Sequence, residues 1–260
     1  MTARPFRSSR SALPILKMIK QKLVILHGWA VHSAIWYTVE EELSDHFEMY
    51  PIDLPGYGNR QSENGDLNLD QLADDMLSQA PENAHWVGWS LGTMIAMSAA
   101  LRQTDRINSL TLFSPTPLFM QAEGWDHGIT LPALENLQAR FHTDYDTALK
   151  RFLLMQAGTD QAARSNAKAT WQRLTQSPAP TKATLDAGLE ILKTTDLRGA
   201  VQDISVPTRI ITCREDRVIP AAAGQALHQM ISQSTLLELP SGHAPMIEIP
   251  SQFVQAITAN

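Results

Sequence analysis

The chain has 260 residues, of which 43% are hydrophobic and 18% are charged, a composition that predicts a globular protein with one main core rather than a disordered chain. The formal net charge of -6 has the wrong sign for a protein whose main partner is the phosphate backbone of a nucleic acid. The single cysteine, Cys213, excludes an internal disulfide and fits a reducing cytoplasm, and no Cys/His group has the spacing of a zinc site.

Residues 1–17 contain Arg4, Arg7 and Arg10 but no acidic residue, and their apolar stretch is too short for the core of a signal peptide. Two interpretations remain open for this segment: a disordered leader, or a start-site artefact if translation begins at Met18. No apolar run in the sequence approaches the ~20 residues needed to cross a bilayer, so we expect no integral membrane protein.

Short runs rich in β-forming residues alternate with segments whose apolar residues recur at helical spacing. The predicted strands are Leu23 to Leu26, Phe47 to Asp53, His85 to Trp89, Ser109 to Ser114, Thr208 to Cys213 and Thr235 to Leu239. The predicted helices between the first of them are Trp36 to Leu43, Leu69 to Leu77 and Leu91 to Gln103. This alternation predicts an α/β fold, a mainly parallel sheet built from right-handed βαβ units and covered by helices on both faces.

The alternation stops between residues 118 and 196, where only helical patterns follow one another. They are Leu131 to Phe141, Asp146 to Gln156, Gln161 to Gln176 and Thr181 to Thr194. An all-helical insertion in an α/β sheet is typical of a lid over the carboxyl ends of the strands, where ligands bind. We therefore expect a core of residues 18–117 and 197–260 and a helical lid of residues 118–196.

The sequence Gly88-Trp89-Ser90-Leu91-Gly92 lies between a predicted strand and a predicted helix. In a Gly-x-Ser-x-Gly elbow, the serine sits on a strained turn that exposes its hydroxyl, and the two glycines remove side chains that would clash there. The context of this motif predicts Ser90 as a nucleophile. A serine hydroxyl is weak at neutral pH, so it needs a base and donors for the developing oxyanion.

In α/β-hydrolases the acid and the histidine follow the serine, each after a later strand. Asp216 and His243 occupy such positions, so we predict that His243 is the general base and that Asp216 orients its imidazole. Glu215 is the rival of Asp216, but it is more typical of a solvated charge. Asp53 precedes the serine and lies in a glycine-rich and proline-containing turn, which favours a structural role.

The oxyanion needs two donors. The N–H of Leu91, at the start of the helix after the serine, is the natural first donor. The loop after the first strand normally gives the second, and there the sequence predicts the N–H of Trp29. We expect His27 in the same loop to be a structural hydrogen-bonding residue.

Four segments together are similar to one family. They are His27 to Trp29, Asp53 to Gly58, Gly88 to Gly92 and Gly188 to Arg198, and they resemble the pimeloyl-[acyl-carrier protein] methyl ester carboxylesterases of biotin synthesis, within the α/β-hydrolase superfamily. The likeness runs from about Leu23 to the C-terminus. It implies a hydrolase that releases methanol from its carrier-bound ester without a cofactor, with Ser90, Asp216 and His243 as the triad.

The resemblance also implies substrate and carrier contacts. The substrate contacts would be Trp29, Ser90, Leu91, Phe152, Leu153, Leu154, Met155, Gln156 and His243. The acidic acyl carrier protein would dock on the lid cations Lys150, Arg151, Arg164 and Lys168. The chain departs from the family at Thr147, where a further arginine is expected. We expect a monomer.

Two other functions remain open from the residues alone. A general short-chain carboxylesterase or thioesterase would use the same triad without preferring a carrier. A ligand receptor on the same fold would use no catalysis at all, although an intact triad disfavours it. An aspartate nucleophile, which dehalogenases and epoxide hydrolases of this fold need, is absent from the elbow.

Overall fold

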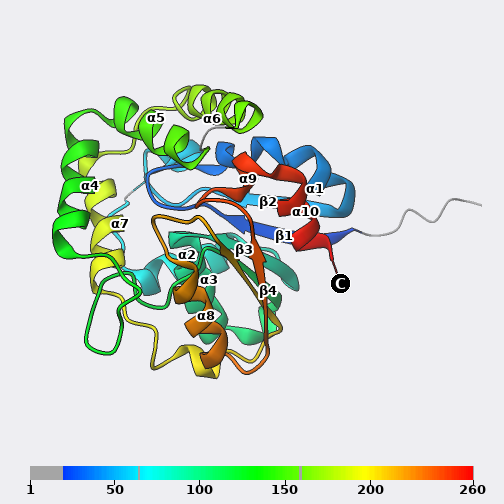
Figure 1. Ribbon diagram of the computed structural model, residues 1–260. Helices are drawn as coiled ribbons and strands as arrows, with labels where there is room; N and C mark the ends of the chain where they lie inside the picture. Colours follow the sequence, from blue (N-terminus) through cyan, green and yellow to red (C-terminus); the bar gives the residue numbers. More distant parts are fainter. Residues whose placement is uncertain (1–19, 64, 158–159, 260) are drawn as a thin grey trace, which may run out of the picture.

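The computed structural model describes residues 20–63, 65–157 and 160–259, so the predicted leader of residues 1–17 lies outside it. Within these residues the centre is a six-stranded sheet in the order β2-β1-β3-β4-β5-β6, with every neighbouring pair parallel (Figure 1). The strands are β1 (Gln21–Leu26), β2 (Phe47–Ile52), β3 (Ala84–Trp89), β4 (Ile107–Phe113), β5 (Thr208–Cys213) and β6 (Ser234–Leu239). The predicted parallel sheet is confirmed.

Helices cover both faces of the sheet (Figure 1). One face is covered by α2 (Leu69–Gln79), α3 (Leu91–Arg102) and α8 (Ala221–Met230), and the other by α1 (Glu40–His46), α9 (Pro245–Glu248) and α10 (Pro250–Thr258). Alternate strand residues point to opposite faces, so Val24 joins the first core cluster while Ile25 joins the second.

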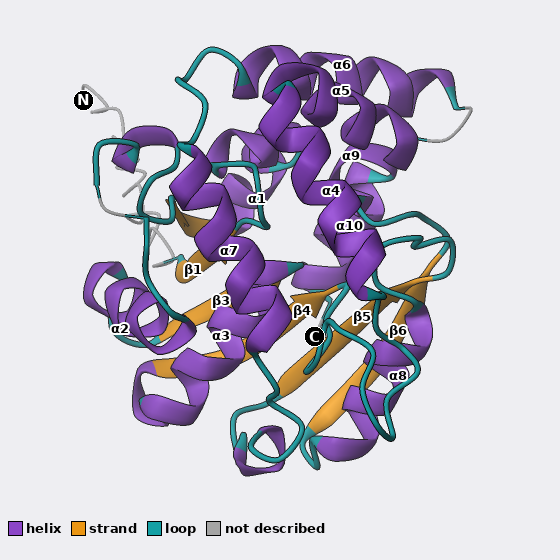
Figure 2. Cartoon of the chain, turned by 90° about the vertical axis from the view of Figure 1, so that its left-hand side faces the viewer, coloured by secondary structure: helices purple, strands orange, loops and turns teal. Residues whose placement is uncertain are grey.

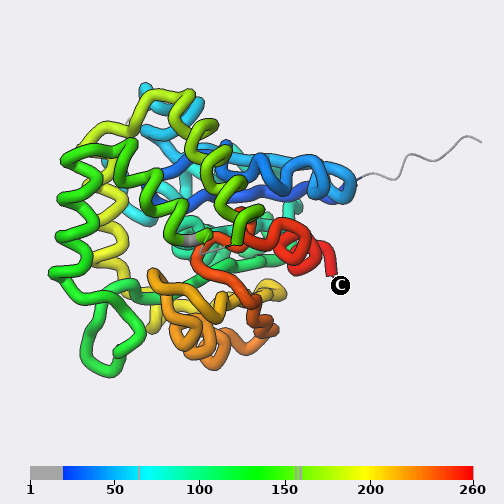
Figure 3. Tube along the Cα trace, turned by 45° about the horizontal axis from the view of Figure 1, so that its top comes forward, coloured from blue at the N-terminus to red at the C-terminus, as the bar shows by residue number. Residues whose placement is uncertain are grey.

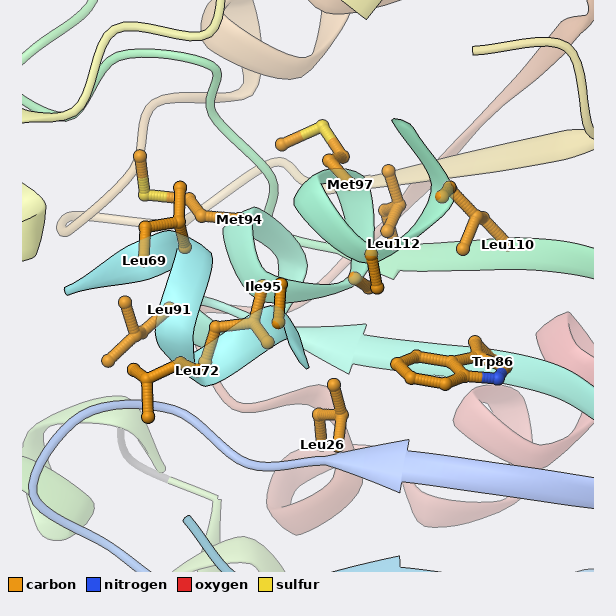
Figure 4. Close-up of a cluster of buried hydrophobic side chains, with 14 of the residues drawn as sticks. Leu26, Leu69, Leu72, Trp86, Leu91, Met94, Ile95, Met97, Leu110 and Leu112 are labelled. Carbon is orange, nitrogen blue, oxygen red and sulfur yellow. The ribbon is translucent and has the colours of Figure 1, made fainter. Parts of the chain in front are cut away.

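The first cluster shows how the sheet positions α3, the helix that follows the predicted nucleophile. Figure 4 shows Trp86 and Leu112 of the sheet facing Ile95 and Met97 of α3, with Leu72 of α2 beside them. The side chains labelled there are buried. Because protein interiors are closely packed, such contacts resist a shift of the helix relative to the sheet. The start of α3 is therefore fixed against the carboxyl end of β3.

The segment between the fourth and fifth strands forms a separate layer of helices. These are α4 (Leu131–Thr143), α5 (Tyr145–Gln156), α6 (Gln161–Leu174) and α7 (Lys182–Thr194). They lie across the side toward which the strands run (Figures 1 and 2), and Figure 3 shows the same helices from another direction. At the base of this layer, Leu197 N–H donates to Pro117 O at 2.8 Å. The helices predicted from the sequence for this segment are present.

Some segments differ from the sequence expectations. The predicted helix of Trp36 to Leu43 is wrong in its form: it is a 3-10 helix, η1 (Ser33–Thr38), followed by α1 after a break at Val39. Short 3-10 segments also occur at η2 (Gly58–Arg60), η3 (Thr104–Arg106) and η4 (Val201–Asp203). The helical insertion also contains isolated β-bridges, such as the one joining Leu118 to Asp196. A single bridge leaves no β-rich run for sequence periodicity to detect.

Candidate active site

Ser90 occupies a strained turn between β3 and α3. Its φ of 55° and ψ of -122° are rarely adopted by residues other than glycine, and its N–H donates to Phe113 O at 3.1 Å. A Cβ at Gly88 would lie 2.5 Å from the carbonyl oxygen of Gly92, and one at Gly92 would lie 2.5 Å from that of Leu26. The two glycines therefore allow β3, α3 and β1 to approach one another closely enough to fix the turn, and they leave Ser90 half-buried.

The three residues predicted as a triad come together. Nε2 of His243 lies 3.0 Å from Oγ of Ser90, and its Nδ1 lies 2.7 Å from Oδ2 of Asp216. Because the carboxylate accepts the Nδ1–H, Nε2 is left to accept the serine proton. The residues come from the ends of β3, β5 and β6, although 153 positions separate the serine from the histidine.

The surroundings of Asp216 keep it ionised. Its Oδ1 accepts hydrogen bonds from the N–H groups of Val218 at 2.8 Å and Ile219 at 2.9 Å. Burial raises the pKa of the Asp216 carboxyl, but the charge and hydrogen bond of His243 and the Ile219 N–H outweigh it, so the pKa lies below its ordinary value. A buried carboxylate that stays charged can orient the imidazole and stabilise the imidazolium.

Two residues for which the sequence predicted no structural role, Trp89 and Glu248, hold the His243 loop. The indole N–H of Trp89 donates to the carbonyl oxygen of His243 at 2.6 Å, and the two rings lie 5.3 Å apart. Gly242 N–H donates to both carboxylate oxygens of Glu248, at 2.9 and 3.1 Å. Burial raises the pKa of Glu248 to about 7, with Glu215 adding to the rise. No local motif marks these contacts, because each joins the loop to another element.

The loop after β1 lies beside the nucleophile. A Cβ at Gly28 would be 3.1 Å from Cβ of Ser90, so the Gly28 backbone passes directly along the serine side chain. Leu91 is the first residue of α3 on the other side. The backbone N–H groups of Trp29 and Leu91 remain the predicted oxyanion donors, flanking the serine from these two elements.

His27 holds this loop from the core side. It is fully buried, its Nδ1–H donates to Gly28 O at 2.9 Å, and its Nε2 accepts Leu54 N–H at 3.0 Å. Burial lowers the pKa of His27 to about 4, so the ring is neutral at physiological pH. Asp53 accepts the N–H groups of Ser33 at 2.7 Å and Asn59 at 2.8 Å. These bonds fit the structural roles expected for His27 and Asp53.

The lid residues expected to contact substrate lie in different environments. The ring of Phe152 is 6.3 Å from that of His243, which brings α5 to the triad. Leu153 is fully buried in the second core cluster, Leu154 is half-buried, and Met155 is 57% exposed. The side chain of Gln156, at the end of α5, lies outside the described residues. Phe152 therefore faces a predicted catalytic residue.

A cavity of about 560 Å³ lies between α4 and α5. Its lining is largely apolar, with Phe141, Phe152 and Met155, and Arg140 and Arg151 stand among these residues. Phe152 lines this cavity, and its ring also faces that of His243 at 6.3 Å.

The lid cations expected to dock a carrier lie on two neighbouring helices. Lys150 Nζ stands 4.4 Å above the ring of Trp171, and Arg151 is exposed beside the cavity. Arg164 and Lys168 are exposed on α6. The structure thus brings all four onto α5 and α6.

Other kinds of site find little support in the part of the chain that is described. No group of three or more His, Cys, Asp or Glu residues there is arranged to hold a metal ion. None of the helices described is both long and apolar enough to span a membrane. Cys213 is buried, and burial raises the pKa of its thiol to about 12, which makes it a poor nucleophile.

Comparison with known proteins supports the same chemistry. Residues 23–256 match the model of the alpha/beta hydrolase family. The chain is 33% identical over 238 residues to the pimeloyl-[acyl-carrier protein] methyl ester esterase of Pectobacterium carotovorum, covering 91% of this chain and 92% of that one. It is 35% identical over 238 residues to the protein of the same name from Citrobacter koseri, with the same coverage.

Among solved structures, an esterase from Exiguobacterium antarcticum resembles this one with a TM-score of 0.81. The two chains are 22% identical, and the match covers 93% of this chain and 91% of that one. At this identity the likeness shows the fold alone.

Proposed function

Because the chain belongs to the alpha/beta hydrolase family, and within it to the pimeloyl-[acyl-carrier protein] methyl ester esterases, we propose that it cleaves the methyl ester of pimeloyl-acyl carrier protein in biotin synthesis. It is a serine carboxylesterase whose products are pimeloyl-acyl carrier protein and methanol. The observation that carries the proposal is the chain of hydrogen bonds from Ser90 through His243 to Asp216.

In the first half of the reaction, Ser90 Oγ attacks the ester carbonyl carbon while His243 Nε2 takes the hydroxyl proton. The carbonyl oxygen becomes an oxyanion, which the N–H groups of Trp29 and Leu91 stabilise. When the tetrahedral intermediate collapses, the bond to methoxide breaks, and the imidazolium returns its proton to the leaving oxygen. Methanol departs and the acyl group remains on Ser90.

In the second half, a water molecule replaces the alcohol. The water oxygen attacks the acyl carbon while His243 Nε2 takes one proton from the water. The N–H groups of Trp29 and Leu91 stabilise the second oxyanion that forms. The bond to Ser90 Oγ then breaks and the serine recovers its proton from the imidazolium. Asp216 stays ionised throughout and stabilises the imidazolium that forms in each half.

We assign the acyl chain to the lid side of the site. Phe152 borders both the triad and the apolar cavity, and Met155 extends that lining. Residues 118–196 then form a lid over a core of residues 18–117 and 197–260. Gln156 and Leu154 complete the proposed contact segment, while Leu153 supports it from within the core cluster.

The carrier would dock on the cations of α5 and α6. A chain of net charge -6 repels an acidic carrier on average, so docking needs a local concentration of positive charge. Lys150, Arg151, Arg164 and Lys168 provide it on adjacent helices. Thr147 adds no charge to this set. Its N–H and hydroxyl donate to the carboxylate of Asp144, the N-cap of α5, at 3.0 and 2.7 Å.

The docking surface has a direct test. Arg151→Glu combined with Lys168→Glu reverses two of the proposed cations, and Lys182→Glu combined with Lys193→Glu makes the same charge change on exposed positions of α7. We expect the first pair to lower kcat/KM for the carrier-bound ester about tenfold or more, and to leave the free dimethyl ester of pimelate within about twofold. The α7 pair should change neither.

Equal losses on both substrates, or none on either, would contradict docking and favour the carrier-independent esterase. Labelling of Ser90 by a fluorophosphonate probe separates both enzymes from a non-catalytic receptor, which the probe would not label.

The biological role has a separate test. The gene should restore growth of a biotin-requiring strain that lacks the esterase, and the Ser90→Ala gene should not. If the wild type is well expressed and fails, the substrate assignment is wrong. The proposal also includes a monomeric enzyme in the cytoplasm, which gel filtration and cell fractionation check.

A further inference from the structure

The loop that carries the predicted oxyanion donor contains a strained residue. Ala30, directly after Trp29, has a φ of 62°, in the left-handed region that costs a residue with a Cβ on the order of 1–3 kcal/mol. Such a conformation persists only where neighbouring contacts determine it. Ala30 is buried, so residues from other parts of the protein surround it and can hold this conformation.

The contacts come from the lid helices. The hydroxyl of Tyr145, at the start of α5, donates to the carbonyl oxygen of Ala30 at 2.9 Å. The indole N–H of Trp29 donates to Leu185 O of α7, also at 2.9 Å. The Trp29 ring meets that of Phe141 in α4 edge to face, with 4.6 Å between centroids. The turn thus belongs to the core, but residues of α4, α5 and α7 bind it from the lid side.

Tyr145 is the lid residue that contacts the backbone of the turn itself, while the buried Tyr57 hydroxyl of the core interacts with the Ala30 backbone as well. Its ring is anchored against Phe141 at 5.9 Å, which aims the hydroxyl. Burial raises the pKa of Tyr145, so the hydroxyl keeps its proton and remains a donor. On the core side, the His27 Nδ1–H holds Gly28 O at 2.9 Å. The segment that carries the Trp29 N–H is therefore fixed from both ends.

We propose that Tyr145 is a positioning residue, whose hydroxyl holds the Ala30 carbonyl and thereby keeps the Trp29 N–H directed at the oxyanion. This inference rests on the proposed esterase function and extends it from the core to the lid. The same helix carries Arg151 and Phe152 further along. An acyl group or carrier bound to α5 therefore acts on the helix that holds the oxyanion turn.

The test is Tyr145→Phe, which removes the hydroxyl and keeps the ring packing. Its matched control is Tyr37→Phe, because the Tyr37 hydroxyl also bridges core and lid, donating to Asn166 O of α6 at 3.3 Å, away from the oxyanion turn. Steady-state kinetics with p-nitrophenyl butyrate are compared with the inhibition constant of butylboronic acid, which forms an anionic tetrahedral adduct on an active serine. Thermal unfolding of each variant is measured alongside.

For Tyr145→Phe we expect kcat to fall about fivefold with KM within about twofold, and the boronic acid to bind about fivefold more weakly, because the Trp29 N–H that Tyr145 positions stabilises the tetrahedral species more than the bound ester. Tyr37→Phe should match the wild type in all three quantities. A role confined to lid stability would lower the unfolding temperature of both variants without this separation of kcat from KM.

Wild-type kinetics in Tyr145→Phe, or equal losses in both variants, would overturn the inference and leave the proposed function intact. A wild type that cleaves p-nitrophenyl butyrate but not the carrier-bound methyl ester would overturn the substrate assignment, while the Tyr145 comparison still decides the inference. A wild type that cleaves neither ester would overturn both.

Discussion

The indole N–H of Trp89 donates a 2.6 Å hydrogen bond to the carbonyl oxygen of His243, so the residue before the nucleophile holds the backbone of the general base. Trp89→Phe removes this donor. We expect kcat to fall about tenfold with little change in KM, because His243 then samples orientations away from Ser90.

Trp36→Phe is the control for packing. Trp36 is buried in the same cluster, 6.3 Å from the Trp89 ring, and its Nε1 makes no hydrogen bond to any described residue. Both variants should lose some stability in thermal unfolding, but only Trp89→Phe should lose activity. Equal kcat values in the two variants would show that the hydrogen bond has no catalytic effect.

Asp216→Asn should be far more damaging. An amide in place of the carboxylate can donate an N–H group to His243 Nδ1, which favours the tautomer in which Nε2 carries the proton and cannot accept from Ser90. We expect kcat to fall by about 10⁴ with the fold retained. Stopped assays of the free ester measure the loss, and circular dichroism checks the fold. A loss under about tenfold would remove Asp216 from the triad.

Gly188→Ala tests the packing of the lid on the oxyanion loop. A Cβ at this position would lie 2.6 Å from Cδ1 of Trp29, so the indole or helix α7 must shift. We expect kcat to fall about tenfold, because the Trp29 bond to Leu185 O is strained or lost. Gly199→Ala, where a Cβ meets no atom within 4 Å, is the control and should retain wild-type kinetics. If the two variants behave alike, the close approach of Gly188 to Trp29 does not matter.

Glu248 predicts a pH dependence of stability. Burial raises its pKa to about 7 from 4.5, so between these values the folded chain holds a proton that the unfolded chain has released. The free energy of unfolding therefore decreases as pH rises through this window.

Glu248→Gln carries no titrating proton but keeps an oxygen that can accept Gly242 N–H. Relative to the wild type, it should gain on the order of 1 kcal/mol in unfolding free energy between about pH 5 and about pH 8, a figure reduced for the partial exposure of the side chain. Urea unfolding at both pH values measures the difference. The Glu215 and Asp216 carboxylates face Glu248 and contribute to its raised pKa. If the difference in unfolding free energy between the two proteins does not change with pH, Glu248 is not the titrating group.

The sequence was informative where chemistry follows local order along the chain. Ser90, Asp216 and His243 each follow a β-rich run, and the parallel sheet brings the carboxyl ends of its strands to one edge. Their meeting at 3.0 and 2.7 Å therefore follows from the topology. The helices of residues 131–194 were also predictable, because their apolar residues recur with a regular period.

The supporting contacts were not predictable in this way. Trp89 reaches His243 across 154 positions, and Tyr145 reaches Ala30 across 115, and no periodicity encodes either distance. The left-handed conformation at Ala30 could not be predicted either, because the residue there is not a glycine. The segment of Trp36 to Leu43 misled because its apolar spacing suits a short 3-10 turn followed by a helix as well as it suits one helix.

The central claim is that Ser90 cleaves the methyl ester of pimeloyl-acyl carrier protein, and methanol release from that substrate tests it most directly. Mass spectrometry of the carrier follows the same step as the loss of one CH₂ unit. The wild type should release one methanol for each carrier converted, and Ser90→Ala should be slower by about 10⁴ or more. Equal rates for the two proteins, or no conversion by a wild type that a fluorophosphonate labels at Ser90, would contradict the claim.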